Sequence, residues 1–339
     1  MKISDIRIPE DLIAQYPMPE REKCRLLCLD KSTGSIKHMV FENVISLFNK
    51  DDLVVFNNSK VVKARFDGAK STGGKVELFL IRPVEGAKGS WHCLIKGKNI
   101  QKGTIISIGG SDLKVEVESH EDDGTFVVSF DDKIDIFKVM EDLGRLPLPP
   151  YIKRMPNMDD NRYYQTVFAN AEGSVAAPTA ALHFTEGLVD KMHSKGVNTG
   201  FVTLHVGYGT FSMIRDIDNH IMHDEFYSVS ETLEQKIKEC KSKGGKVWAV
   251  GTTVVRTLET AFNKDLNLGR PAGFTSLFIR PGYEFRVVDA IITNFHHPET
   301  TLIYLVSAFA GIDNIVKAYE DAVNKEYRLL SYGDAMAII

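Results

Sequence analysis

Cysteine is scarce in this sequence, and long hydrophobic runs are absent. Four cysteines in 339 residues are too few for the disulfide framework of a small secreted protein, so they indicate a reducing compartment. The opening residues, MKISDIRIPEDLIAQYP, show no apolar core followed by a cleavage site for export. The most apolar helical segment, Thr301–Gly311, is much too short to span a bilayer. These absences predict a cytoplasmic protein without a membrane partner.

Spacings typical of metal ligands are also scarce. Cys24 and Cys28 stand four apart, but Lys31 occupies the place of the third thiolate in a C-x3-C-x2-C cluster motif. Both cysteines are therefore interpreted as strand residues. His220 and His223 are three apart, which without a distant further ligand is more typical of a hydrogen-bonded pair than of a metal site. The sequence thus predicts no metal centre.

The region between residues 61 and 145 differs in character from the rest of the chain. Short strands alternate there with glycine-rich turns, a pattern typical of a small antiparallel barrel or sandwich. A proline-rich segment, GRLPLPPYI (144–152), forms a stiff return. Because 339 residues exceed what one core comfortably serves, we expect two domains, an insert of residues 61–145 and a discontinuous domain of residues 1–60 and 146–339. The elements expected in the insert are strands at Val76–Ile81, Trp91–Ile95, Thr104–Ile108, Leu113–Val117 and Thr125–Phe130, and a helix at Ile134–Leu143.

Strand–corner–helix units recur outside the insert and predict the fold class. A strand at Val247–Val250 leads through Gly-Thr-Thr into a helix, and a strand at Phe285–Thr293 leads through Asn-Phe-His-His-Pro into another. Such units indicate a partly parallel sheet whose polar strand tips gather on one side. We therefore expect an α/β fold, a mixed sheet with an inserted small β-barrel-like domain. The other expected elements are strands at Arg25–Leu29 and Asp52–Phe56, helices at Pro9–Tyr16, Phe41–Phe48, Glu231–Lys243 and Thr300–Ala310, and a helix plus a turn over Tyr319–Ile339.

The stretch from Gly173 to Glu225 combines histidines with many small residues. A packed core needs bulk, so a segment rich in Gly, Ala, Ser and Thr beside His favours backbone held close to a ligand. The alternative is tight packing around histidines that are satisfied inside the core. This stretch contains five of the ten histidines of the chain: His183, His193, His205, His220 and His223.

Positive charge is concentrated between Lys60 and Lys102, where ten Lys and Arg residues stand against three acidic ones. The net charge of this segment is +7, whereas that of the whole chain is −4. An acidic protein with one basic region is expected to bind a polyanion along a local face. The alternative interpretation is a solvated loop surface.

The corners carry groups that suit ligands. The Gly-Thr-Thr corner at 251–253 aims backbone N–H groups above the sheet, which favours a carboxylate or a phosphate, with simple N-capping as the alternative. His296 and His297 precede a helix N-terminus, whose positive end favours a neutral imidazole that can act as a general base. Asn57 and Asn58 follow a strand and either meet a ligand or form an Asx turn.

Eleven motifs, in order and at family-like spacing, resemble the S-adenosylmethionine:tRNA ribosyltransferase-isomerase family of queuosine biosynthesis. The resemblance covers nearly the whole chain. The motifs are LIAQYP (12–17), LVVFNNSKVVKAR (53–65), GGKVELFL (73–80), LPLPPYIKR (146–154), RYYQTVFA (162–169), GSVAAPTAALHF (173–184), TLHVGYGTF (203–211), HIMHDEF (220–226), VGTTVVRTLE (250–259), LFIRPGYEF (277–285) and ITNFHHPETTL (292–302).

The resemblance implies an unusual use of S-adenosylmethionine. Its ribosyl group is transferred to 7-aminomethyl-7-deazaguanine at the wobble position of a tRNA and closes to the epoxycyclopentane of epoxyqueuosine, while adenine and methionine leave. S-adenosylmethionine is then a ribosyl-donating substrate, no metal is demanded, and we expect the chain to act as a monomer. A non-catalytic tRNA-binding protein is the main alternative. Methyl transfer is a poorer one, because no strand–GxGxG–helix unit is found.

Roles follow for single residues. We expect His205 or His296 to be the base, with Asp289 or Glu225 orienting an imidazole. Arg256 is expected to be a charge partner of the methionine carboxylate, with a structural salt-bridge residue that faces away as the equal alternative, because it lies within the helix. The expected contacts to S-adenosylmethionine are Gly207, Gly209, Thr210, Gly251, Thr252 and Thr253.

The remaining assignments concern the RNA. Thr179 and His183 are expected to shape the deazaguanine pocket, where Phe184 can stack on the base. Pro178, Asn57 and Asn58 are expected to bind substrate as well. The residues expected to contact tRNA phosphates are Lys60, Lys63, Arg65, Lys96 and Lys98.

Overall fold

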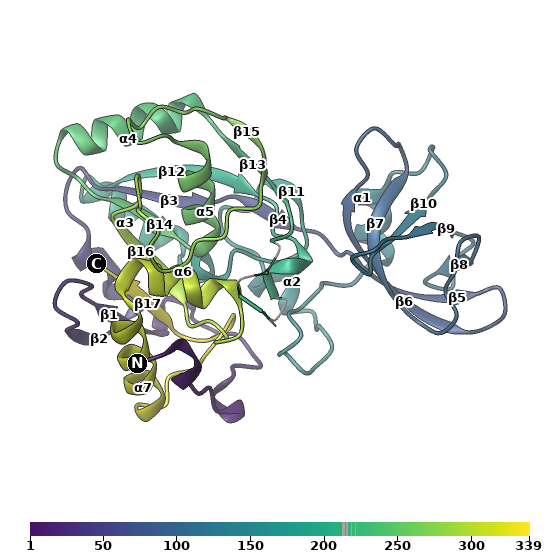
Figure 1. The fold of residues 1–339 in the computed structure, drawn as a ribbon, viewed down its shortest axis with the longest axis horizontal. Coiled ribbons are helices and arrows are strands. Elements are labelled where there is room, and N and C mark those ends of the chain that lie inside the picture. Colours follow the sequence, from purple (N-terminus) through teal and green to yellow (C-terminus); the bar gives the residue numbers. More distant parts are fainter. Residues whose placement is uncertain (212–213, 215, 218, 221) are drawn as a thin grey trace.

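The larger part of the molecule, here called the body (residues 1–61 and 146–339), is built on a nine-stranded mixed sheet (Figure 1). The computed structural model describes residues 1–211, 214, 216–217, 219–220 and 222–339, without the side chains of residues 210 and 211. The strand order is β15-β13-β12-β3-β14-β16-β17-β1-β2, and the four strands from β12 to β16 run parallel to one another. The strands are β1 (Arg25–Leu29), β2 (Ile36–Val40), β3 (Leu53–Asn57), β12 (Asn198–Leu204), β13 (Glu225–Val229), β14 (Val247–Val250), β15 (Ala272–Thr275), β16 (Ala290–Asn294) and β17 (Ala335–Ile338).

Both faces of this sheet are covered, because the side chains of its central strands are apolar on either side. Leu53 and Val55 of β3 join the core beneath α4 to α7, whereas Val54 and Phe56 join the core beneath η4, η5 and α3. This alternation follows from the two-residue period of a strand. The helices of the body are α2 (Asp160–Tyr163), α3 (Glu186–Ser194), α4 (Glu231–Ser242), α5 (Thr252–Ala261), α6 (Thr301–Ala310) and α7 (Ile312–Asn324), and its 3-10 segments are η1 (Ile3–Asp5), η2 (Glu10–Leu12), η3 (Arg21–Lys23), η4 (Phe41–Leu47), η5 (Thr179–His183) and η6 (Tyr208–Phe211).

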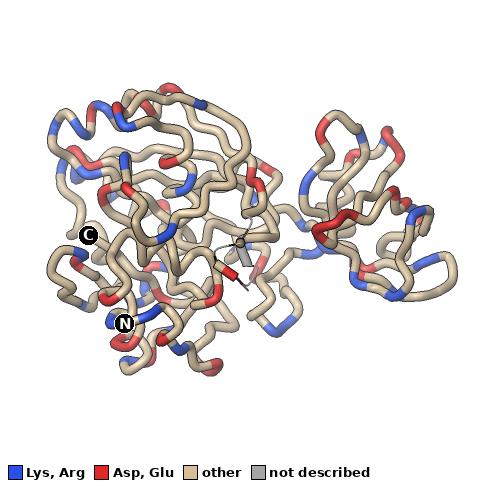
Figure 2. The backbone as a smooth tube through the Cα atoms, viewed as in Figure 1, with Lys and Arg blue, Asp and Glu red and all other residues tan. Residues whose placement is uncertain are grey.

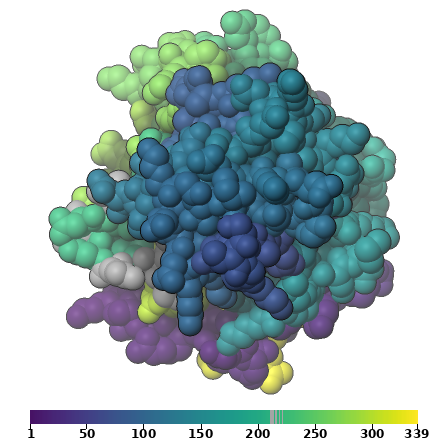
Figure 3. All heavy atoms as spheres, turned by 90° about the vertical axis from the view of Figure 1, so that its right-hand side faces the viewer, coloured from purple at the N-terminus to yellow at the C-terminus, as the bar shows by residue number. Residues whose placement is uncertain are grey.

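The smaller part is a closed antiparallel barrel that stands beside the body (Figures 1 and 3). Its own apolar core includes Phe66, Leu78 and Val117, which are almost completely buried. The expected β-barrel-like insert in a mixed α/β fold is thus confirmed, while the limits 61–145 stay a prediction. The barrel consists of β5 (Arg65–Lys70), β6 (Lys75–Pro83), β7 (Ser90–Lys96), β8 (Ile105–Ile108), β9 (Lys114–His120) and β10 (Phe126–Ser129), followed by α1 (Ile136–Leu143).

The two connections between barrel and body run side by side. The N–H groups of Arg65 and Arg145 each donate to the carbonyl of the other, at 3.2 and 2.7 Å. A Cβ on Gly144 would lie 1.8 Å from the carbonyl oxygen of Lys63, so only glycine permits this approach. On the body side, the outgoing chain pairs as β4 (Ser59–Val61) with β11 (Ala171–Ser174). The returning chain is anchored by Arg154, which donates to both carboxylate oxygens of the buried Asp160.

The expected strand at Phe285–Thr293 is shorter in the structure and begins only at Ala290. The buried carboxylate of Glu259 accepts hydrogen bonds from the backbone N–H groups of Arg286, Val287 and Val288. Since these donors are used by a side chain, the segment before β16 does not pair with a neighbouring strand. A local apolar pattern cannot reveal such a distant acceptor.

The two ends of the chain also differ from expectation. Only Glu10–Leu12 forms a helical turn within the expected helix Pro9–Tyr16, because Leu12 and Ala14 exchange backbone hydrogen bonds with Leu329. The expected helix Phe41–Phe48 is a 3-10 segment. At the C-terminus, Ala335–Ile338 is strand β17, inserted between β16 and β1, where only a helix and a turn were expected.

In the described part of the chain, no single helix has the length and apolar character needed to cross a membrane. The pair α6 and α7 meets that condition only when taken together, and it is bent by 112°.

Candidate active site

The turn after β12 is held from below by a buried ion pair. The backbone N–H of Gly207 donates to one carboxylate oxygen of Glu225 at 2.7 Å, and the guanidinium of Arg256 contacts the other. Arg256 lies within α5, is buried, and also donates to the carbonyls of Thr275 and Leu277. Arg256 therefore positions Glu225 and does not serve as the expected charge partner of a ligand carboxylate. Glu225 in turn fixes the Gly-x-Gly turn through the N–H of Gly207.

His205 lies directly after the last residue of β12, against the backbone of Gly173. A Cβ on Gly173 would lie 3.2 to 3.3 Å from three atoms of the imidazole ring, and the φ of this glycine is +130°. The ring stacks on Phe226, with centroids 5.9 Å apart. Its Nδ1 is buried and has no hydrogen-bond partner among the described residues, and burial lowers the pKa of His205. A neutral imidazole with an uncommitted nitrogen can accept a proton at pH 7.

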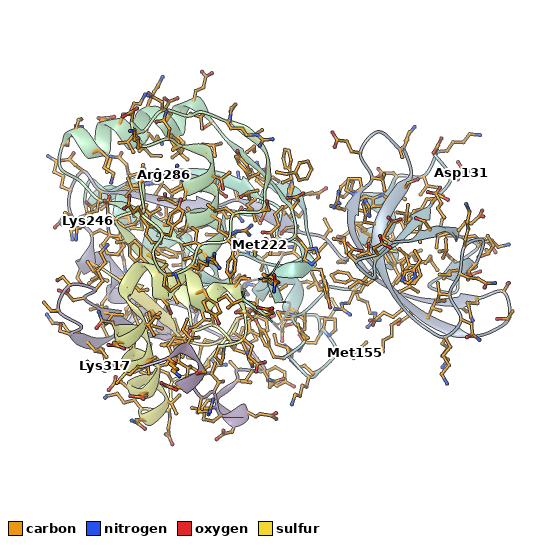
Figure 4. The ribbon with its side chains drawn as sticks, in the orientation of Figure 1. Asp131, Met155, Met222, Lys246, Arg286 and Lys317 are labelled. Carbon is orange, nitrogen blue, oxygen red and sulfur yellow. The ribbon has the colours of Figure 1, made fainter. Side chains whose placement is uncertain are left out.

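This histidine lines a cavity of about 610 Å³ between the body and the barrel. The volume falls within the range of typical small-molecule sites. Met222, labelled in Figure 4, belongs to its wall. Five lining residues are carboxylates, whereas Arg82 is the single Lys or Arg among the described ones, so the cavity favours a cation. The lining residues are Ile81, Arg82, Pro83, Glu85, Trp91, His92, Asp123, Thr125, Phe137, Glu172, Gly173, His205, Val206, Gly207, Tyr208, Gly209, Met222, His223, Asp224, Glu225, Phe226 and Phe274.

A smaller hollow of about 60 Å³ lies next to the cavity, and Val206 lines both. Its floor is the N-terminus of α5, where Gly251 has a φ of +96° and no side chain caps the helix. The hydroxyl of Thr253 is buried without a hydrogen-bond partner among the described residues. An unpartnered hydroxyl beside free helix N–H groups suits an anionic group. The expected residues Gly251, Thr252, Thr253, Pro178 and Thr179 all line this hollow.

His296 also lines the small hollow, but its environment differs from that of His205. It is nine-tenths buried, and its Nε2 lies 2.8 Å from the hydroxyl of Thr293. Its backbone N–H donates to the hydroxyl of Tyr319 at 2.6 Å. Burial lowers the pKa of His296 to about 3. The structure therefore separates the two expected bases, since each lines a different hollow.

His183 lies outside both hollows, in a buried hydrogen-bond network. Its Nε2 accepts from the amide of Asn294 at 3.2 Å, and its Nδ1 lies 3.1 Å from the sulfur of Cys24. Burial lowers the pKa of His183 to about 4. Phe184 is completely buried against Phe41 and cannot stack on a base in this arrangement. The expected role of both residues in a deazaguanine pocket is corrected, because their side chains serve the core.

The side chains of the two asparagines at the tip of β3 both form hydrogen bonds with neighbouring residues. Asn57 is buried, and its amide pairs with both the N–H and the carbonyl of Leu204. Asn58 accepts from the hydroxyl of Thr203 at 2.7 Å. The Asx-type interpretation therefore describes Asn57, whose side chain also accepts from the N–H of Ser59. Neither asparagine lines a described cavity.

Asp289 does not orient an imidazole. It precedes β16, and its carboxylate binds the ammonium of Lys241 at 2.6 Å through both oxygens. One oxygen also accepts from the N–H of Val247, the first residue of β14. Asp289 thus lies at the N-terminal ends of the parallel strands, whereas His296 follows the C-terminal end. The expected role of Asp289 is wrong, because Asp289 and His296 lie at opposite ends of strand β16.

The basic residues beside the barrel form ion pairs on the surface. Lys60 pairs with Glu172, Lys63 with Glu141, and Arg65 with Glu77, at 2.6 to 2.9 Å. Figure 2 shows basic and acidic residues interspersed over both parts of the molecule. The pair of Lys60 with Glu172 is exposed, and exposed ion pairs contribute little to stability. Their contact with RNA stays a prediction, as it does for Lys96 and Lys98.

Several residues of the large cavity were missed by the sequence argument. Gly173 was quoted only as part of a motif, although its missing side chain makes room for His205. Gly209 was expected at the site. Glycine suits this position, because a Cβ there would lie 2.3 Å from the ring of His223. Trp91 and Phe137 come from the barrel, which was assigned to RNA binding alone. No local sequence pattern could have predicted that Trp91 and Phe137 line this cavity, because its walls come from both the barrel and the body. Thr210 was also expected here, but its side chain lies outside the described residues.

No group of three or more His, Cys, Asp or Glu among the residues that the structure describes is arranged to hold a metal ion. The four cysteines are all buried and free.

Comparison with known proteins identifies the family of this chain. Residues 4–338 match the family described as queuosine biosynthesis protein. An S-adenosylmethionine:tRNA ribosyltransferase-isomerase of Clostridioides difficile (strain 630) is 46% identical over 344 residues, which cover 100% of both chains. The crystal structure of an S-adenosylmethionine tRNA ribosyltransferase from Thermotoga maritima matches with a TM-score of 0.57 at 35% identity, covering 99% of this chain and 100% of that one. The chain therefore belongs to the queuosine biosynthesis protein family.

Proposed function

We propose that this chain catalyses the reaction for which its relative from Clostridioides difficile is named, the transfer and isomerisation of the ribosyl group of S-adenosylmethionine on tRNA. The acceptor is 7-aminomethyl-7-deazaguanine at the wobble position, and the product is epoxyqueuosine, with adenine and methionine released. The observation that carries this proposal is the cavity of about 610 Å³, in which an uncommitted imidazole stands among carboxylates. Those are the groups that a sulfonium substrate and a proton abstraction require.

The charge of the cavity fits S-adenosylmethionine. Its sulfonium carries a positive charge. Glu172 and Glu225 are paired with Lys60 and Arg256, so the negative charge beside Arg82 comes from Glu85, Asp123 and Asp224, which stabilise a cation by Coulomb attraction in a partly enclosed space. Aromatic faces of Phe226 and Phe274 add a surface on which adenine can stack. The backbone of the Gly207–Gly209 turn lies along the same wall.

The methionine part of the substrate extends past Val206 into the small hollow. Its carboxylate then lies at the N-terminus of α5, where the hydroxyl of Thr253 and the helix N–H groups can donate to it. Thr253→Val keeps the shape and removes only the hydroxyl. Because this hydroxyl has no partner in the described part of the chain, the variant should fold normally and bind S-adenosylmethionine several-fold more weakly in calorimetry. Equal affinity would move the carboxylate elsewhere.

His205 is the proposed base for the chemistry. The sulfonium acidifies the ribose carbon next to sulfur, so one neutral imidazole can start the rearrangement. The pKa of His205 is lowered by burial, which keeps the ring unprotonated at neutral pH. The amine nucleophile must also be neutral, and the carboxylates of the cavity can take its proton.

The tRNA partner sets the remaining expectations. We expect the protein to act as a monomer, since one chain supplies both walls of the cavity, and to act in the cytoplasm, where it would meet its tRNA substrate. Lys60, Lys63 and Arg65 lie where the chain passes from body to barrel and hold the RNA backbone next to the site.

Release of adenine tests the whole proposal. The protein is incubated with S-adenosylmethionine and a tRNA that carries the deazaguanine precursor, and free adenine is measured. Ribosyl transfer releases adenine in proportion to modified tRNA. Methyl transfer would leave adenine bound in the sulfur-containing product, and a binding protein without catalysis would release none, so either outcome would contradict the proposal.

A further inference from the structure

A third hollow lies in the seam between barrel and body, on the other side of the turn that walls the large cavity. It measures about 220 Å³, and Gly207 and Tyr208 line both spaces. Its other walls are the prolines of the returning chain (147, 149 and 150) and barrel residues around Arg65 and Phe79. We call it the seam hollow. None of the roles assigned above uses it as a binding pocket.

The seam hollow differs from the large cavity in charge. It is lined by Arg65 and Lys96 against the single carboxylate of Glu77. Lys96 takes part in none of the ion pairs found in the described part of the chain. The Nε of Arg65 is buried and has no hydrogen-bond partner among the described residues. The seam hollow therefore favours an anion, whereas the large cavity favours a cation.

Aromatic rings form part of the same wall. The guanidinium of Arg65 lies over the ring of Phe79 at 4.5 Å, and the ring of Tyr208 meets Phe79 edge to face at 6.1 Å. Tyr208 is 40% exposed and lines the seam hollow. An exposed ring beside a fixed guanidinium is the combination on which unpaired bases stack in single-stranded RNA sites.

We infer that the seam hollow binds an unpaired nucleotide of the RNA substrate, next to the nucleotide that is modified. Its base stacks on Tyr208, and its phosphate lies near Lys96 and Arg65. The shared wall of Gly207 and Tyr208 then lets one nucleotide enter the large cavity while its neighbour is held outside it. This inference deepens the proposed function and rests on it for the identity of the RNA.

The test is a double-mutant cycle between protein and RNA. Binding of an anticodon stem-loop is measured for the wild type and for Tyr208→Leu, with an abasic nucleotide placed at each loop position in turn. For the wild type, one position beside the target should cost about tenfold in affinity when its base is removed. The same change should cost nothing further in Tyr208→Leu, because the ring that the base contacts is already missing.

Phe201→Leu is the matched control. Phe201 is 41% exposed, nearly the same as Tyr208, and lines neither the large cavity nor the seam hollow. It should show the full abasic effect. Additive effects of Tyr208→Leu and the abasic change at every loop position would overturn the inference, as would a wild type that does not bind the stem-loop.

A second variant predicts a change of opposite sign. Glu77 shares its carboxylate between Arg65 and Arg145, at 2.9 and 3.5 Å. Glu77→Gln should strengthen stem-loop binding several-fold at low salt, because it removes the anion that competes with a phosphate. Weaker binding by a variant that unfolds at the wild-type temperature would count against the seam hollow. Adenine release by the wild type is measured in parallel, so a binding result can stand even if the proposed reaction fails.

Discussion

His205 and His296 occupy similar places in the chain, each just beyond the end of a strand, yet the structure treats them differently. His205 has a buried nitrogen without a hydrogen-bond partner among the residues that the structure describes, and it lines a space of about 610 Å³. His296 is bonded to Thr293 and lines a space of about 60 Å³. Proximity to a strand tip therefore does not by itself make a histidine available for catalysis. The deciding property is whether a ring nitrogen already forms a hydrogen bond with a neighbouring residue.

The largest expected effect comes from replacing the two histidines by alanine. His205→Ala should lower turnover by about a hundred- to ten-thousand-fold, since general-base assistance is worth that much, and should leave the affinity for tRNA near normal. His296→Ala should act mainly through stability. Adenine release and thermal unfolding of both variants measure the two effects. A large loss of turnover in His296→Ala with little loss in His205→Ala would reverse the comparison.

The ion pair beneath the turn offers the next test. Arg256→Met leaves the carboxylate of Glu225 buried with its guanidinium partner removed, which should lower the free energy of unfolding by about 3–5 kcal/mol in urea titrations. Lys238→Met is the matched control, because it breaks an exposed pair with Glu234 on α4 and should cost about 0.3–0.5 kcal/mol. Equal losses in the two variants would show that burial of the pair is unimportant.

A pH series sharpens the contrast further. The pKa of an unfolded histidine is about 6.5, whereas in the folded protein burial lowers the pKa of His296 to about 3. The unfolded chain therefore binds more protons between these values, so stability is full above about pH 6.5 and falls as the pH is lowered toward 3. His296→Gln should reduce this slope, while His193→Gln on the exposed end of α3 should not. Stability that rises on acidification to pH 4 would contradict the argument.

The smallest expected effect concerns the RNA backbone. Each lost phosphate contact should lower the slope of log K against log salt by about one unit, so a Lys60, Lys63 and Arg65 triple alanine variant is expected to show a clearly shallower slope. Lys317→Ala provides the control, since Figure 4 shows Lys317 on the side of the body away from the barrel. Identical slopes for the triple variant and the wild type would place the RNA elsewhere.

Much of the fold was accessible from local sequence patterns. Strand β14 has the predicted bounds, and the alternation of short strands with glycine turns indicated the barrel. The segment Phe285–Asp289 was wrongly predicted as strand and strand β17 was missed, because the structure of both depends on partners that lie far away in the chain. The carboxylate of Glu259 accepts hydrogen bonds from backbone N–H groups of Phe285–Asp289, and β17 pairs between β16 and β1.

The candidate site was predicted in part for the same reason. The stretch rich in small residues and histidines contains His205, Gly207 and Glu225, and these three line one cavity in the structure. Patterns could not show that Asp289 lies at the other end of the sheet, or that His183 is bound by Asn294. Such facts depend on strand direction and on which neighbour accepts a hydrogen bond, and neither is encoded locally.

The position of β17 has a consequence for how the protein is made. This strand lies near the last residue of the chain, yet it is the one that joins β1 and β2, from the beginning of the chain, to the rest of the sheet. The N-terminal hairpin is therefore synthesised first and incorporated last, whereas the barrel can complete its strand pairs long before. A chain without Ala335–Ile338 would keep every strand pair of the barrel but would leave β1 and β16 without their shared partner. The sheet would then present open strand edges, which invite pairing with other chains.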